Sequence, residues 1–382
     1  MPKLFVPKET QAGETRVAAT PETVKAYVKA GLEVVVEANA GRAAHMLDPS
    51  YEQAGARITS SPASEWGQAD LILKVNGPSA DEAALIKPAG VLVSFISPHK
   101  NLPLVNALVA KKVTTLAMEL VPRITRAQKM DALSSQASIA GYKAVLIGAT
   151  RLDKYFPLLM TAAGTVQPAK VVIMGAGVAG LQAIGTAKRL GAVVWVSDVR
   201  PAAKEQVESL GGKFIDLPME ESGEGQGGYA KEMSKEFLAK QQAIIAEHVA
   251  SADVVITTAQ IPGKPAPRLV SAATVERMRP GSVIVDLAAE QGGNCELTEA
   301  GKDVVKHEVL IIGSTNLPAS MPLDASMLYS RNVAALVLHL LKKDDAGVSL
   351  HIDITEEVTG GTLLTHAGVV MHAPTAQALK GA

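Results

Sequence analysis

Three glycines in the run GAGVAG are spaced so that the backbone around them can hold a pyrophosphate. Gly175 permits a tight turn, Gly177 lets the backbone approach a ligand, and Gly180 lets a helix pack closely on a strand. A helix that starts at Val178 and Ala179 offers free N–H groups and the positive end of its dipole to phosphate oxygens. The pattern therefore predicts a dinucleotide site lined by the whole turn.

An acidic residue stands at the tip of the next expected strand. A lone glycine pattern also marks ordinary turns, but here a β-branched run precedes it, and the strand Ala192–Ser197 later ends at Asp198. A carboxylate there accepts from adenosine ribose hydroxyls and repels a 2′-phosphate, which favours NAD(H) over NADP(H). Arg200 could bind the 2′-phosphate of NADP(H), but the residue at the strand tip is the acidic Asp198. We expect Asp198, Val199 and Arg200 to contact the cofactor.

A polar loop, residues 123–136, has two possible roles. It holds Arg123, Gln128, Asp131 and Ser134. A guanidinium and an amide can fix a planar carboxamide or a pyrophosphate, and an Asp can hold the Arg. The same composition is typical of an exposed loop in which Asp131 or Ser134 caps the following helix. Composition alone leaves both interpretations open.

Tyr229 lies in an acidic, glycine-rich segment without apolar periodicity. Connections this long inside a compact domain are often functional lids. The tyrosine either closes over the bound nucleotide and excludes water, or only tethers the segment, and both interpretations stay open.

The loop after the expected strand Asp253–Thr258 is another wall of the nucleotide crevice, because ligands bind at the carboxyl ends of parallel strands. We expect Thr258, Ala259 and Gln260 to contribute to the cofactor site. Lys74 and His99 also lie at strand ends, in the first domain, but each alone is more often structural or solvated than catalytic. No metal is expected, because C-x-x-C, H-E-x-x-H and phosphate-loop patterns are missing and the histidines are scattered.

Strands and helices alternate along the chain, which predicts an α/β fold. We expect two doubly wound, Rossmann-like domains with parallel sheets and a cleft between them. One domain comprises residues 1–134 plus about 330–382, and the other, with the glycine turn, comprises residues 135–329. A helix from about Ser135 towards Tyr155 connects them, and Thr161–Pro168 is expected to be a linker.

Composition excludes several classes of protein. The net charge of −1 makes no case for binding nucleic acid or an anionic membrane. Cys295 is the one cysteine, so an internal disulfide framework is excluded and a reducing compartment is favoured. Uncharged stretches are broken by Gly, Thr, Gln or His, so no direct membrane span is expected.

Several stretches together resemble the alanine dehydrogenase/pyridine nucleotide transhydrogenase family. They run in family order from Pro7 to Thr298 and include PKETQAGETRVAATPETV, RITRAQKMDALSSQ, the glycine turn and AQIPGKPAP. The second and the last look specific to the transhydrogenase branch. The resemblance implies an NAD(H)-binding homodimer that docks, on the cytoplasmic side, on membrane-embedded subunits carrying an NADP(H)-binding domain. It also implies Re/Si-specific, proton-coupled hydride exchange that regenerates NADPH.

The resemblance also implies roles for residues. Arg123, Gln128, Asp131 and Ser134 match the family loop that holds the nicotinamide with its ribose and phosphate, so we expect them to be catalytic as well as cofactor-binding. Tyr229 matches the tyrosine of the family's mobile loop. Gly175, Gly177, Gly180 and Asp198 match the nucleotide fingerprint.

An alanine dehydrogenase is the alternative. There, Arg16 and Lys74 would match residues that grip a substrate carboxylate, and a catalytic histidine is expected where this chain has Ser97, with His99 two residues away. Reductive amination needs a positioned acid or base, whereas direct hydride passage between two nicotinamides needs positioning and exclusion of water. A site rich in hydrogen-bonding groups that hold a ligand, but poor in titrating groups, suits direct hydride passage between two nicotinamides.

Overall fold

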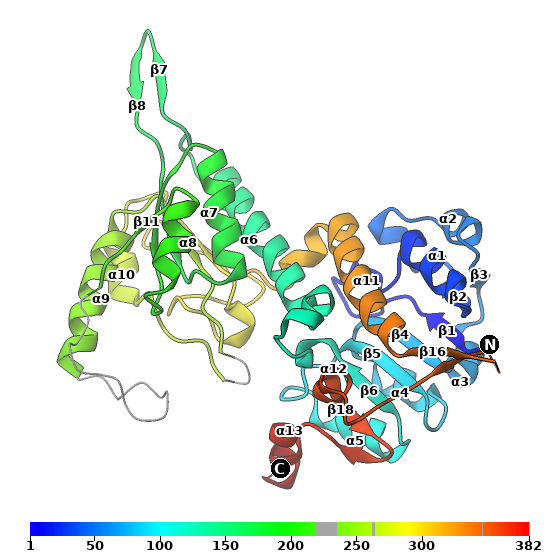
Figure 1. The fold of residues 1–382 in the computed structure, drawn as a ribbon. Helices are drawn as coiled ribbons and strands as arrows, with labels where there is room; N and C mark the ends of the chain where they lie inside the picture. Colours follow the sequence, from blue (N-terminus) through cyan, green and yellow to red (C-terminus); the bar gives the residue numbers. More distant parts are fainter. Residues whose placement is uncertain (218–234, 262–263, 346, 382) are drawn as a thin grey trace. The chain divides into compact units, whose positions relative to one another are not determined.

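The computed structural model describes residues 1–217, 235–261, 264–345 and 347–381, and the described chain forms two compact units (Figure 1). Unit 1 comprises Met1–Gln136 and Pro318–Ala382, and unit 2 comprises Ala137–Leu317. Both ends of the described chain therefore belong to unit 1.

Unit 1 is built on an eight-stranded sheet whose strand order is β19-β18-β6-β5-β4-β1-β2-β3. The strands from β3 to β6 pair in parallel, and β18 and β19 are antiparallel additions at one edge. The strands of the sheet are β1 (Lys3–Val6), β2 (Glu33–Glu37), β3 (Arg57–Thr59), β4 (Leu71–Asn76), β5 (Val91–Phe95), β6 (Thr114–Ala117), β18 (Leu363–His366) and β19 (Val369–Val370), and a separate hairpin comprises β16 (Leu341–Asp344) and β17 (Gly347–Leu350).

Helices cover both faces of this sheet because successive strand side chains alternate between two apolar cores. Leu4 and Val6 face a core that contains residues of α1, α2, α11 and α12, whereas Phe5 faces a core that contains residues of α3 and α5. The helices of unit 1 are α1 (Pro21–Lys29), α2 (Asp48–Gln53), α3 (Pro62–Gln68), α4 (Ala80–Leu85), α5 (Leu102–Ala110), α11 (Pro322–His339), α12 (Glu357–Thr362) and α13 (Ala373–Gly381).

Unit 2 has a seven-stranded sheet with the order β11-β10-β9-β12-β13-β15-β14. All pairs are parallel except β14 with β15, which are joined by a two-residue turn with positive φ at His307 and Glu308, a geometry that makes hairpins. The strands are β9 (Lys170–Met174), β10 (Val193–Ser197), β11 (Lys213–Phe214), β12 (Val254–Thr257), β13 (Val283–Asp286), β14 (Asp303–Lys306) and β15 (Val309–Ile312).

Two helical layers enclose this second sheet. Val171 and Ile173 pack against residues of α6 (Ala132–Arg151), α7 (Val178–Arg189) and α8 (Ala203–Ser209). Val172 and Met174 pack on the other side against α9 (Lys235–Ala250) and residues around α10 (Ala272–Glu276). Both units therefore have the doubly wound, Rossmann-like architecture expected from the alternating elements, with antiparallel strands added at an edge of each sheet.

Two local expectations need correction. The segment expected to be a linker contains a hairpin of β7 (Leu159–Thr161) and β8 (Gly164–Val166), which projects from the body of unit 2 (Figure 1). The domain boundary placed near residue 330 falls inside α11. Tyr329, Val333 and Leu336 of that helix are buried in the core of unit 1, so the whole helix belongs there. Among the described residues, none of the helices is both long and apolar enough to cross a membrane.

Candidate functional site

The glycine turn lies at the carboxyl end of β9, an interior strand of the unit 2 sheet that pairs with β10 and β12. Gly175 has φ +107°, a conformation that side-chain-bearing residues rarely adopt. The Thr258 hydroxyl donates to the carbonyl oxygens of Met174 and Gly175, each at 3.2 Å. Thr258 thus ties the loop after β12 to the turn.

The other two glycines of the turn have opposite surroundings. A methyl group added at Gly180 would overlap with the carbonyl oxygen of Gly175 and lie 2.9 Å from its carbonyl carbon, so the start of α7 packs directly on the turn. A methyl group added at Gly177 would meet no atom within 4 Å. Gly177 is the N-cap of α7 and provides no side-chain cap, so the first N–H groups of the helix are available to an anion. This open face fits a pyrophosphate.

Asp198 lies beside the turn, and its side chain is only 5% exposed. Its Oδ2 accepts from the backbone N–H of Ala176 at 2.6 Å, and its Oδ1 accepts from that of Arg200 at 2.8 Å. The Arg200 guanidinium donates to both carboxylate oxygens at 3.0 Å. Burial by itself would raise the pKa of Asp198, but the hydrogen bonds from Arg200 and Ala176 outweigh it and lower that pKa. The ionised carboxylate fits the hydroxyls of an adenosine ribose, and Val199 beside it is 90% exposed.

Asn294 and Asp286, which are not among the residues expected in the cofactor site, support the loops after β12 and β13. The Asn294 side chain accepts from the N–H of Ala259 at 3.1 Å and donates to the carbonyl oxygen of the same residue at 2.9 Å. Gln260 donates to the carbonyl oxygen of Leu287 at 2.7 Å. Asp286 is fully buried and accepts four hydrogen bonds, from Thr257, Ala288, Cys295 and Thr298. The sequence signal was their position beside a Gly-Gly loop after a strand.

The polar loop of unit 1 contains the 3₁₀ helix η3 (Thr125–Met130) and leads into α6. Asp131 accepts from the backbone N–H of Ser134 at 2.9 Å and from its hydroxyl at 2.6 Å, so these two residues meet as a helix cap. Arg123 and Gln128 are exposed, and in the described residues of the chain neither side chain has a hydrogen-bond partner. The loop thus combines a rigid cap with two uncommitted polar groups. Tyr229 lies outside the described residues.

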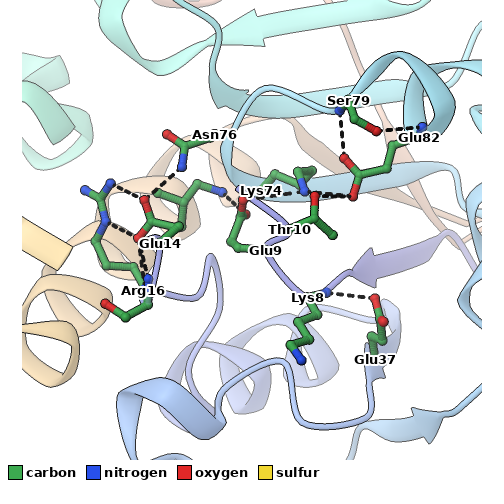
Figure 2. Close-up of polar contacts among 12 residues, drawn as sticks. Lys8, Glu9, Thr10, Glu14, Arg16, Glu37, Lys74, Asn76, Ser79 and Glu82 are labelled. Atoms are coloured by element: carbon green, nitrogen blue, oxygen red, sulfur yellow. Dashed lines mark hydrogen bonds and ion pairs between the residues drawn. The ribbon is translucent and has the colours of Figure 1, made fainter. Parts of the chain in front are cut away.

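A buried charge cluster in unit 1 joins the segment after β1 to β4 and α4 (Figure 2). Arg16 donates to both oxygens of Glu14, at 2.8 and 2.7 Å. Lys74 is 1% exposed, and its Nζ lies 3.5 Å from Glu9 Oε2 and 3.3 Å from Glu82 Oε1. Both cations expected to grip a substrate carboxylate in the alternative interpretation are therefore already paired with carboxylates of the chain.

His99 is exposed and lies in the loop after β5. Partial burial of its ring and the nearby charge of Lys100 lower the pKa of His99, which favours the neutral imidazole. The described residues provide no hydrogen-bond partner that would orient this imidazole.

The two buried glutamates of the cluster titrate in opposite directions. Burial raises the pKa of Glu9 from 4.5 to about 7 despite the attraction of Lys74. For Glu14, burial acts in the same direction, but the hydrogen bonds from Arg16 outweigh it and lower the pKa to about 2. Glu9 therefore stabilises the fold when protonated, and Glu14 stabilises it when ionised.

We expect the free energy of unfolding of unit 1 to fall by about 2 kcal/mol as the pH rises from 5 to 7.5, because folded Glu9 retains a proton that the unfolded chain has lost. The contribution is fully present below pH 4.5 and lost through pH 7. Glu9→Gln should remove most of this slope. Denaturant titrations that follow Trp66 of unit 1, in a Trp195→Phe background, measure it. A wild-type curve that is flat over this range would mean that Glu9 is ionised in the folded protein.

Comparisons with known proteins place the chain in a family. Residues 5–140 match the family model "Alanine dehydrogenase/PNT, N-terminal domain", and residues 144–373 match the corresponding C-terminal domain. The first part of NAD(P) transhydrogenase subunit alpha of Rhodospirillum rubrum is 50% identical over 97% of this chain and 98% of its own length. Alanine dehydrogenase 2 of Staphylococcus aureus is 31% identical over 89% of this chain and 88% of its own.

Solved structures agree with the sequence matches. The crystal structure of transhydrogenase from Sinorhizobium meliloti has a TM-score of 0.86 and 47% identity, and the match covers 96% of this chain and 99% of that one. NAD(H) is accordingly the cofactor of this protein. With both domain models matched along nearly its whole length, the chain belongs to the alanine dehydrogenase/PNT family.

Proposed function

We propose that this chain is the NAD(H)-binding component of a Re/Si-specific, proton-translocating NAD(P)⁺ transhydrogenase, which passes a hydride directly between NADH and NADP⁺ held by a partner. The observation that carries the proposal is the glycine turn with its open face at Gly177 beside the ionised carboxylate of Asp198. The similarity to transhydrogenase alpha subunits supports it.

The bound dinucleotide supplies the hydride chemistry: the dihydronicotinamide of NADH gives up a proton and two electrons as hydride, becoming NAD⁺, while NADP⁺ becomes NADPH. The residues of the chain bind and orient. The N–H groups at the start of α7 hold the pyrophosphate, and Asp198 accepts from the ribose hydroxyls. Arg123 and Gln128 clamp the nicotinamide end, supported by the Asp131–Ser134 cap. No side chain needs to donate or remove a proton.

The cofactor site is completed by loops. Val178, Ala179 and the residues after β12, Thr258 to Gln260, line it, and Tyr229 closes over it. Two copies of the chain form a dimer, which docks on the cytoplasmic side of membrane subunits that hold NADP(H). The Rhodospirillum rubrum relative is named as the first part of a subunit alpha, which supports an assembly of several chains.

The paired charges of unit 1 favour this function over amino-acid oxidation. A substrate carboxylate could bind Arg16 only by breaking its bidentate pair with Glu14, and Lys74 is buried between the side chains of Glu9 and Glu82. Moving either cation to a new anion would leave a buried carboxylate without its partner, which is costly.

We expect the purified chain to bind NADH yet to transfer hydride only when the partner subunits are added. The experiment incubates NADH with the thionicotinamide analogue of NADP⁺, whose reduction has its own absorbance, with and without the partner. Exchange that depends on the partner supports the proposal. Alanine-dependent reduction of NAD⁺ by the chain alone, or no exchange with the partner, would contradict it.

A further inference from the structure

The carboxylate at the strand tip has no acceptor position left for a ribose. A carboxylate offers about four lone-pair positions, two on each oxygen. On Asp198, Oδ1 accepts from the N–H and Nε of Arg200, and Oδ2 accepts from the N–H of Ala176 and from Nη2 of Arg200. While these four hydrogen bonds are in place, Asp198 cannot accept hydrogen bonds from two ribose hydroxyls.

We propose that the Arg200 guanidinium occupies the ribose-binding positions of Asp198 and is displaced when NAD(H) binds, so that Arg200 weakens NAD(H) affinity. Removing the guanidinium opens one acceptor position on each oxygen. The two neighbouring ribose hydroxyls each donate one hydrogen bond, so they need one free acceptor position on each carboxylate oxygen. The proposal rests on NAD(H) binding at the glycine turn, but on nothing about hydride transfer or partners.

Exposure decides which partner of the pair moves. The Arg200 side chain is 61% exposed, whereas that of Asp198 is 5% exposed. The guanidinium can turn into water and be fully hydrated there, while the carboxylate stays held by the backbone N–H groups of Ala176 and Arg200. Those two anchors come from the main chain, so truncating the Arg200 side chain leaves Asp198 in place.

The competition should be measurable but moderate. Exposed ion pairs contribute little, yet this one has two charge-assisted hydrogen bonds to a buried carboxylate. We therefore expect Arg200→Ala to bind NADH about three- to tenfold more tightly than the wild type. Arg200→Lys retains the charge but cannot form the bidentate contact, so its NADH affinity should lie between those of the wild type and Arg200→Ala.

Adenine nucleotides without the nicotinamide test the ribose contact directly. In isothermal titration calorimetry, ADP should bind Arg200→Ala more tightly than the wild type by the same factor as NADH. In contrast, 2′,3′-dideoxy-ADP should bind the variant and the wild type with equal affinity. Arg189→Ala is the matched control, because Arg189 is an exposed arginine at the end of α7 and removing it changes the net charge equally. It should leave every affinity unchanged.

Several results would overturn the proposal. Weaker or unchanged binding of NADH by Arg200→Ala would mean that the guanidinium stays in place or contributes to the bound state. Equal tightening with dideoxy-ADP, or with Arg189→Ala, would mean that the gain in affinity does not come from the contact between Asp198 and the ribose. Wild-type protein that binds neither NADH nor ADP would also refute the proposed function, whereas normal wild-type binding with no gain in the variant would refute only the role of Arg200.

Discussion

Gly180→Ala is expected to lower the free energy of unfolding of unit 2 by about 2–4 kcal/mol and to abolish NADH binding. The added methyl group would overlap with the carbonyl oxygen of Gly175, a backbone atom directly after β9. Neither α7 nor β9 can move away without opening the core between Ile173 and Ile184. Denaturant unfolding followed by Trp195, in a Trp66→Phe background, measures the loss.

Gly177→Ala is the matched control, because it adds the same methyl group at another glycine of the turn. Gly177 has φ −74°, which alanine adopts without strain, and the methyl group would stand in open space. Stability should therefore change by less than about 1 kcal/mol. NADH affinity should still fall at least about tenfold, because the methyl group occupies the surface that a pyrophosphate must approach. Normal NADH binding by a folded Gly177→Ala would show that the pyrophosphate binds elsewhere.

Arg123→Ala should slow hydride exchange with the partner-bound NADP⁺ about 100-fold while changing the NADH dissociation constant by less than about threefold. Arg123 is exposed and has no hydrogen-bond partner among the described residues, so its removal leaves the loop folded. What is lost is the orientation of the nicotinamide. Single-turnover exchange and NADH titration, performed on the same protein, separate the two effects.

Arg126→Ala controls for the loss of a positive charge in the same loop. Arg126 is 58% exposed and pairs with Glu356 and Glu357, so its guanidinium is already committed. We expect exchange within about twofold of the wild type. Equal losses of rate and affinity in Arg123→Ala would point to a simple binding role instead of orientation, and equal slowing in both variants would point to the net charge of the loop.

Local patterns were sufficient for much of the nucleotide-binding fold. The β-branched run before Gly175, the glycine spacing and the acid after the second strand are all consequences of short-range geometry. Strand, turn and helix appear in the structure where these patterns predict them. The residues expected after β12 also lie beside the turn, because Thr258 bonds to its carbonyl oxygens.

Other features depend on residues far apart in the chain and could not be read from spacing. The return of the last segment to the first unit was expected, but its start was placed near residue 330, inside α11. The start of that helix belongs there too because Tyr329 is buried against residues such as Lys74, a contact across 255 positions that no local pattern signals. Composition left open whether Asp131 and Ser134 cap the following helix or hold a ligand, and their hydrogen bonds show that they form a cap. A cap does not exclude the clamp proposed for the same loop.

By itself, the sequence determined the fold class and a dinucleotide turn with an acid at the strand tip, since each depends on neighbours within a few residues or one βαβ unit. Only the tertiary structure decided how the charges are used. It pairs Arg16 with Glu14 and buries Lys74 between carboxylates, and it places the Arg200 guanidinium on Asp198. A pattern of residue types states which charges exist, but their pairing depends on burial and distance, which only packing sets.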